Sequence, residues 1–126
     1  MTKTNPPINS YRDLVVWREG MELAVAAYKL TAEFPRDELY GLTSQIRRSG
    51  ASVPANIAEG YGRESSGAYI QQLRVAQGSL KELETHLLLA SRVGITTMLI
   101  VTPLLDRAEE VGKMLRSLIR SIETTR

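Results

Sequence analysis

Residues 42–64 read LTSQIRRSGASVPANIAEGYGRE, and the arrangement of the remaining chain follows from how this segment packs. Its apolar residues recur at helical spacing, but small residues occupy many positions where a helix usually carries large side chains: Ser49, Gly50, Ala51, Ser52, Ala55, Ala58, Gly60 and Gly62. Pro54 lies in the middle. Glycine costs a helix about 1 kcal/mol relative to alanine, and proline costs about 3 kcal/mol. We therefore expect this helix to form only because close packing against neighbouring helices offsets these costs.

The composition is that of a single small domain. The 126 residues show no compositional break and suffice for one hydrophobic core. Sixteen Lys and Arg against fourteen Asp and Glu give a net charge of +2, short of the clustered charge typical of nucleic-acid-binding proteins. The absence of cysteine suits a reducing cytoplasm, where we expect the protein to act. The polar amino end and the lack of any apolar run of about 20 residues predict no membrane association.

The hydrophobic pattern predicts a flexible arm at residues 1–12 and four helices within residues 13–124, at about 14–33, 42–63, 66–93 and 103–124. Asp13 and Ser65 are expected to cap the first and third helices, and Thr102 with Pro103 to begin the fourth. Gly94 marks the end of the third helix. Because no strand-like segment occurs and the connections are short, the sequence predicts an all-α, antiparallel up-down-up-down four-helix bundle.

The first helix carries two hydrophobic seams where one is usual. The first seam is Leu14, Trp17, Met21, Ala24 and Tyr28, and the second seam is Val16, Gly20, Leu23, Ala27, Leu30 and Phe34. Together they cover about 220° of the helix, against the apolar stripe of about 100° or more expected of a surface helix. Contacts with two neighbouring helices explain much of this width. The excess indicates a contact with another subunit.

The second and third helices are expected to pair in a defined register. If they run antiparallel about the turn at residues 64–65, the residue numbers of each facing pair add up to about 129. Glu82 and Glu84 then lie level with Gln45, Arg47 and Arg48. We predict an ion pair between Arg47 and Glu84, which would do more to set the register than to add stability because it is partly buried.

A polar stripe accompanies the small-residue face of the second helix: Gln45, Ser52, Asn56, Glu59 and Arg63. Glu59 and Arg63 also form an i,i+4 pair. One interpretation is a solvated flank. The favoured one is a helix–helix or subunit interface, also involving Pro54, Gly60 and the two glutamates of the third helix, because Asn and Ser beside glycines are typical of close helix contacts with internal hydrogen bonds.

Catalysis, metals and cofactors have little support in this sequence. It contains no cysteine and no G-x-S-x-G motif, and the lone His86 has no visible catalytic companion. A di-metal site in a bundle needs Glu-x-x-His on two helices, and no glycine-rich phosphate loop follows a strand. We therefore expect no enzyme activity, no catalytic residue, no metal and no cofactor.

Two groups of basic residues are candidates for phosphate contact. The fourth helix carries Lys113, Arg116 and Arg120 on one side, and the junction of the second and third helices carries Arg47, Arg48, Arg63 and Arg74. On the fourth helix a solvated face is favoured, because acids early and bases late in a helix match its dipole. For the second group, structural ion pairs are at least as good an explanation.

Four blocks of the sequence resemble a known family: Y-R-D-L-x-V-W at 11–17, L-T-S-Q-I-R-R-S at 42–49, V-P-A-N-I-A-E-G at 53–60 and G-S-L-K-E-L-E-T at 78–85. They are similar to a bacterial four-helix-bundle family whose founding members are encoded by intervening sequences in 23S ribosomal RNA genes. Its members are often labelled "S23 ribosomal protein", a label that does not imply membership of the ribosome. The positions that match the family's motifs include Arg47, Arg48, Asn56, Glu59, Glu82 and Glu84.

The resemblance implies a left-handed bundle that assembles into a ring, a homopentamer in relatives of known structure. A related protein serves as accessory partner to a reverse transcriptase and uses a basic surface to engage nucleic acid. The chain departs from the commoner pattern at Gly67 and Ala68, where charged residues are frequent. We expect a non-enzymatic homo-oligomer, a pentamer, that binds RNA or DNA through a basic surface of the ring. The alternative is a scaffold or adaptor, such as an accessory subunit to a reverse transcriptase-like partner, without nucleic-acid binding of its own.

Overall fold

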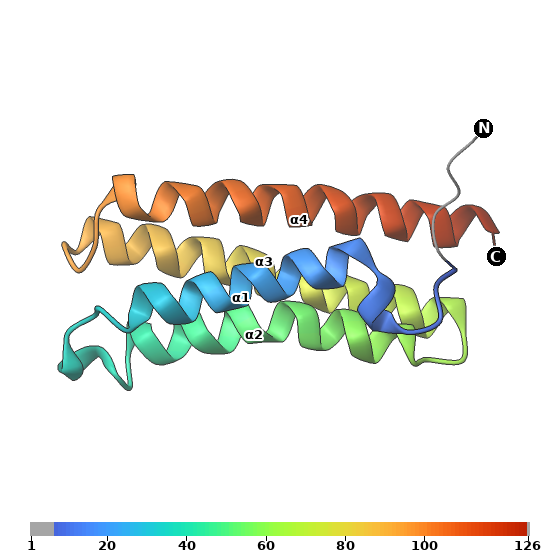
Figure 1. The fold of residues 1–126 in the computed structure, drawn as a ribbon, viewed down its shortest axis with the longest axis horizontal. Helices are drawn as coiled ribbons and strands as arrows, with labels where there is room; N and C mark the ends of the chain where they lie inside the picture. Colours follow the sequence, from blue (N-terminus) through green and yellow to red (C-terminus); the bar gives the residue numbers. More distant parts are fainter. Residues whose placement is uncertain (1–6, 126) are drawn as a thin grey trace.

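The computed structural model describes residues 7–125 and contains four long helices that run alternately in opposite directions (Figure 1). They are α1 (Val15–Thr31), α2 (Leu42–Tyr61), α3 (Ser66–Arg92) and α4 (Met98–Thr125), with short 3-10 turns at η1 (Tyr11–Asp13) and η2 (Arg36–Glu38). The described range contains no strand. The predicted all-α four-helix bundle is therefore confirmed.

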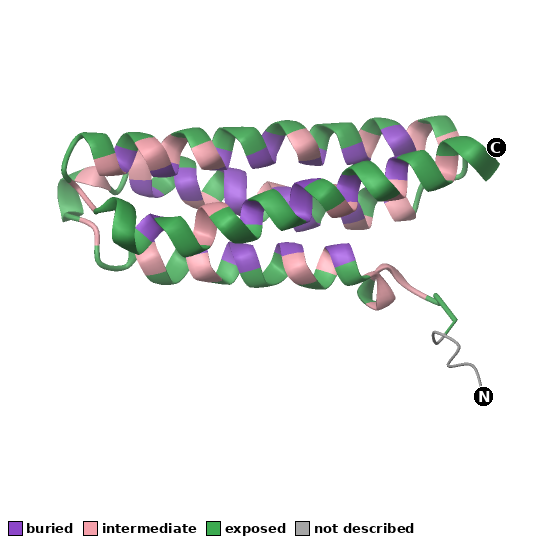
Figure 2. Cartoon of the chain, turned by 90° about the horizontal axis from the view of Figure 1, so that it is seen from above, coloured by how far each residue is buried: buried purple, intermediate pink, exposed green. Residues whose placement is uncertain are grey.

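The core lies along the axis of the bundle and receives side chains from all four helices. Leu23 of α1, Ile57 of α2, Leu83 of α3 and Leu115 of α4 have no exposed surface. Figure 2 shows buried positions recurring along the inward sides of the helices, with exposed positions between them. This is the periodicity that an amphipathic helix produces when one stripe faces a common core.

The end of the predicted arm is folded. The range predicted as an arm was 1–12, of which residues 1–6 lie outside the described part of the chain. Tyr11 begins η1, and its ring lies edge-on against Trp17, with 5.2 Å between ring centres. This contact ties the segment before α1 to the body of the bundle.

Asp13 does not cap α1, contrary to the sequence-based expectation, but completes a capping box with Ser10, the N-cap of η1. Its carboxylate accepts hydrogen bonds from the backbone N–H groups of Asn9 (2.9 Å) and Ser10 (3.1 Å). The carboxylate therefore faces the preceding chain. α1 begins two residues later, after Leu14, which provides no side-chain cap.

The ends of α3 follow the predicted signals. The Ser65 hydroxyl accepts a hydrogen bond from the backbone N–H of Ala68 at 3.1 Å, which confirms the N-cap. At the other end Gly94 has a φ of +83°, a conformation that favours glycine. The following N–H, of Ile95, donates to the carbonyl of Ala90 at 3.0 Å, so the chain closes over the helix end.

α4 begins at Met98, and the prediction that Thr102 and Pro103 start this helix is wrong. The Thr97 hydroxyl accepts a hydrogen bond from the N–H of Ile100 at 3.3 Å, while the Thr102 hydroxyl donates back to the Met98 carbonyl. Pro103 removes one hydrogen bond from the second turn. The carbonyl left without a partner is that of Leu99. The loss of this bond is tolerated because Leu99 and Pro103 are both exposed, so water can donate a hydrogen bond to this carbonyl.

Glycines of α2 lie where neighbouring helices come closest. A Cβ added at Gly60 would lie 2.9 Å from the Cβ of Gln72 and 3.3 Å from the carbonyl oxygen of Tyr69, both on α3. A Cβ added at Gly50 would lie 3.4 Å from the Cβ of Ala27 on α1. Close packing of the small-residue segment is thus confirmed. At this contact, burial and then the nearby Tyr61 phenol raise the pKa of Tyr69 above its ordinary value of 10.0.

Candidate assembly and nucleic-acid surfaces

The polar stripe of α2 lies along the contact between α2 and α3. The hydroxyls of Ser52 and Ser79 are 2.8 Å apart. The Asn56 amide donates to the Ser52 carbonyl at 2.8 Å, and the Gln72 amide donates to the Asn56 side-chain oxygen at 3.3 Å. In each pair that meets across the two helices, the two residue numbers add up to about 130, which confirms the predicted register. Ser79 and Gln72 were missed from the sequence, although that same register would have placed them opposite the stripe.

Ion pairs occupy the two ends of this stripe. The guanidinium of Arg48 contacts the carboxylate of Glu82 on α3 and donates to the Gln45 side-chain oxygen at 2.9 Å. Arg63 pairs with Glu59 at 2.6 Å, as the i,i+4 spacing predicts. All four charged side chains are about half exposed, so each pair contributes at most about 1 kcal/mol.

The predicted pair between Arg47 and Glu84 does not form. The Arg47 Nε donates to the Thr31 hydroxyl at 2.8 Å, and its guanidinium carbon lies 4.8 Å from the centre of the Tyr28 ring. Glu84 pairs instead with Lys81, one turn earlier on α3, at 3.0 Å. The reason is helical rotation: Arg47 projects towards α1, whereas the following arginine projects towards α3.

A basic cavity of about 220 Å³ lies between α3 and α4. Its lining residues are Arg74, Gln77, Arg116, Ile119, Arg120 and Glu123. Arg74 approaches Glu123 at 3.5 Å. Arg116 and Arg120 form no ion pair with any residue in the 7–125 range. Three guanidinium groups therefore share one carboxylate, and Arg74 belongs with the basic residues of α4, not with Arg47, Arg48 and Arg63.

A larger cleft of about 540 Å³ continues from this cavity along α3 and α4. Gln77 and Arg116 line both, which makes the two spaces neighbours. The other lining residues are Leu80, Lys81, Glu84, Ala108, Glu109 and Gly112, so two cations face two carboxylates there. Lys113 lines neither space and pairs with Glu110 at 3.5 Å, although the sequence grouped it with the other cations of α4.

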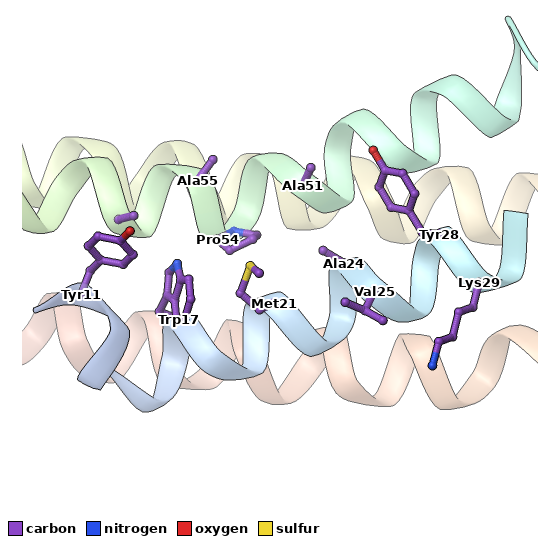
Figure 3. Close-up of a pocket in the computed structure, with 11 residues that line it drawn as sticks. Tyr11, Trp17, Met21, Ala24, Val25, Tyr28, Lys29, Ala51, Pro54 and Ala55 are labelled. Carbon is purple, nitrogen blue, oxygen red and sulfur yellow. The ribbon is translucent and has the colours of Figure 1, made fainter.

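An open apolar groove of about 480 Å³ separates the outer edges of α1 and α2. Figure 3 shows Tyr11, Trp17 and Met21 projecting from the α1 side towards Pro54 of α2. The wall on α2 consists of small residues: Ala51, Pro54, Ala55 and Ala58. The second seam of α1 lies in the core, whereas most of the first seam lines this groove. The excess apolar width of α1 therefore corresponds to a surface that a single chain leaves partly exposed, at Met21, Val25 and Tyr28.

A second exposed apolar region lies at one end of the bundle. The α1–α2 and α3–α4 connections are both at this end, on the left in Figure 1. Tyr40 of the first connection is 92% exposed, and Leu99 in the first turn of α4 is 87% exposed, flanked by the half-exposed Met98 and Ile100. This region is formed by different elements from the groove.

The described part of the chain contains no group of three or more His, Cys, Asp or Glu side chains arranged to hold a metal ion. His86 is half-buried, and its Nδ1 is buried with no hydrogen-bond partner among residues 7–125. No described helix has both the length and the apolar character needed to cross a membrane.

Comparison with known proteins assigns the chain to a family. The family model described as "23S rRNA-intervening sequence protein" matches residues 12–117. A crystal structure of a protein of unknown function from the S23 ribosomal protein family of Bacteroides thetaiotaomicron is similar to this chain, with 30% sequence identity and a TM-score of 0.75. The similarity covers 83% of this chain and 98% of that one. A search of curated proteins found no match. The chain belongs to the 23S rRNA-intervening sequence protein family.

Proposed function

We propose that this protein is a non-enzymatic, cytoplasmic homo-oligomer that binds RNA or DNA through basic surfaces of the assembly. The observation that carries the proposal is the apolar groove itself, where Met21 and Tyr28 of the first seam and the neighbouring Val25 remain 39–48% exposed. Large side chains on α1 face small side chains on α2 across that groove. One chain thus has large apolar side chains on α1 beside a shallow surface of small residues on α2, and packing against a second copy would cover both. The family resemblance implies five copies.

The basic cavity between α3 and α4 supports the nucleic-acid part of the proposal. Arg74, Arg116 and Arg120 come from two helices, and Glu123 is the one carboxylate among the described residues that lines this cavity with them. Guanidinium groups bind phosphate with two hydrogen bonds at once, which makes arginine a preferred phosphate ligand. Assembly would repeat this cavity once per subunit, so several weak phosphate contacts would act together on one strand.

Val25→Glu is expected to break the assembly. Val25 lines the groove and is 43% exposed, so a charge there costs the single chain little but would be buried against apolar side chains in the oligomer. Light scattering should show a multiple of the 14.0 kDa chain mass for the wild type, five-fold for a pentamer, and 14.0 kDa for the variant. Val75→Glu is the matched control, since Val75 on α3 is 42% exposed and lies outside the groove. A wild-type monomer at micromolar concentration would contradict self-assembly.

The nucleic-acid proposal predicts binding that weakens with salt. Fluorescence anisotropy of a labelled single-stranded oligonucleotide should report binding at about 50 mM salt and marked weakening by about 200 mM, because each phosphate contact releases counterions. Absence of binding at low salt, or binding without salt dependence, contradicts the proposal.

An adaptor role without intrinsic nucleic-acid binding is the second candidate, such as an accessory subunit to a reverse transcriptase-like partner. It is favoured by the exposed apolar end around Tyr40 and Leu99, which the groove contact would leave uncovered. In the salt titration this candidate predicts a folded oligomer that binds no strand. It also predicts that a Leu99→Cys chain remains open to thiol labelling in the oligomer, which is measurable because the natural chain has no cysteine.

A further inference from the structure

We propose that the groove between α3 and α4 holds one nucleotide of a single strand, with its phosphate in the basic cavity and its base in the adjoining cleft. This inference rests on the proposed function and specifies where and how the strand binds. The proposed site consists of the basic cavity and the adjoining cleft, which share Gln77 and Arg116 as lining residues.

The size and charge of the smaller space fit a phosphate group. Its volume of about 220 Å³ is below the range of about 300–1,000 Å³ usual for pockets that enclose whole small molecules. Three arginines line it, and two of them have no ion-pair partner in the described range. The remaining arginine, Arg74, is held by Glu123 at 3.5 Å, a long contact between half-exposed side chains. A phosphate would compete with Glu123 for Arg74, so Glu123 weakens binding.

The adjoining cleft fits a base better than a second phosphate. Its lining carries two carboxylates, Glu84 and Glu109, against Lys81 and the shared Arg116, so the cleft has no net positive charge to attract a further phosphate. Lys81 and Glu84 also pair with each other at 3.0 Å. Leu80, Ala108 and Gly112 contribute an apolar wall on which a base face could rest.

Gly112 keeps this wall close to the helix backbone. A Cβ added there would lie 3.4 Å from the Leu80 side chain, so any larger residue would extend into the space beside it.

The carboxylate of Glu109 determines which bases this cleft would favour, because carboxylates accept hydrogen bonds and cannot donate them. Glu109 would therefore favour bases with an exocyclic amino group, such as cytosine or adenine, over uracil. A base can enter only when it is not stacked and paired in a duplex, so the site selects single strands.

The test uses labelled oligocytidine, oligouridine and a duplex of equal length, with anisotropy as the readout and circular dichroism as the check on folding. Arg116→Gln should raise the Kd for oligocytidine about tenfold and lower the salt slope by about one. Glu123→Gln should act in the opposite direction and lower the Kd by up to about fivefold. Arg36→Gln is the matched control, because Arg36 is an exposed arginine on η2, outside both spaces.

Opposite effects of the two variants, together with tighter binding of oligocytidine than of oligouridine or duplex, support the site. If strands bind with salt dependence but both variants behave like Arg36→Gln, the strand binds elsewhere and the site is overturned while the proposed function stands. Equal binding of duplex and single strand overturns placement of the base in the cleft. If no strand binds at low salt, the proposed function and this site both fail.

Discussion

Gly60→Val is expected to lower the free energy of unfolding by about 1–3 kcal/mol, although glycine is normally the poorer residue inside a helix. An added Cβ at Gly60 would lie 2.9 Å from the Cβ of Gln72 and 3.3 Å from the carbonyl oxygen of Tyr69. The second of these atoms belongs to the backbone of α3 and cannot swing aside. The valine would therefore force α2 and α3 apart, which also strains the hydrogen bond between Gln72 and Asn56.

Gly78→Ala is the matched control for this prediction. Gly78 lies within α3, and apart from its chain neighbours and the backbone of α3 itself no described atom lies within 4 Å of the Cβ that alanine would add. This substitution should raise the free energy of unfolding by up to about 1 kcal/mol, because only the helix propensity changes. Urea unfolding followed by circular dichroism measures both, at one protein concentration because assembly would add to stability. A gain in both variants would mean that α2 and α3 are not in close contact at Gly60.

Leu83→Ala should lower the free energy of unfolding by about 2–5 kcal/mol, the largest effect that we expect of any single truncation in this protein. Leu83 has no exposed surface, and one of its methyl groups lies 3.9 Å from the position that a Cβ would take at Gly50. It therefore fills space beside a residue that has no side chain. The cavity left by alanine has no flexible neighbour at Gly50 to fill it, so collapse of the site is limited.

Leu89→Ala tests whether this loss reflects the core or the helix. Leu89 is on the same helix but is 45% exposed, so its truncation should change the free energy of unfolding by no more than about 0.5 kcal/mol. The same urea experiment compares the two. Equal losses would contradict a core packed around Leu83.

The bundle and its α2–α3 register could be predicted because both depend on local information. Apolar spacing along one helix reports which side of that helix is buried, and the short turn before Ser65 sets which residues face one another. The cap at Ser65 and the helix end at Gly94 are also local, since each depends on the backbone of adjacent residues. The start of α4 was harder to predict, because Thr97 and Thr102 are both acceptable N-caps and a proline in the first turns costs little at an exposed site.

The candidate sites depend on how helices are rotated against one another, which no single-helix pattern contains. The sequence alone determined that α1 has two apolar seams, that α2 must pack closely and that basic residues occur on α3 and α4. Only the tertiary structure decided that the first seam borders an open groove, that Arg48 and not Arg47 reaches α3, and that Arg74 joins Arg116 and Arg120. The physical reason is that residues adjacent in sequence point about 100° apart on a helix, so two adjacent arginines reach different neighbouring helices. Which neighbour each one reaches depends on how the helices pack around it, and the apolar spacing along one helix does not specify this.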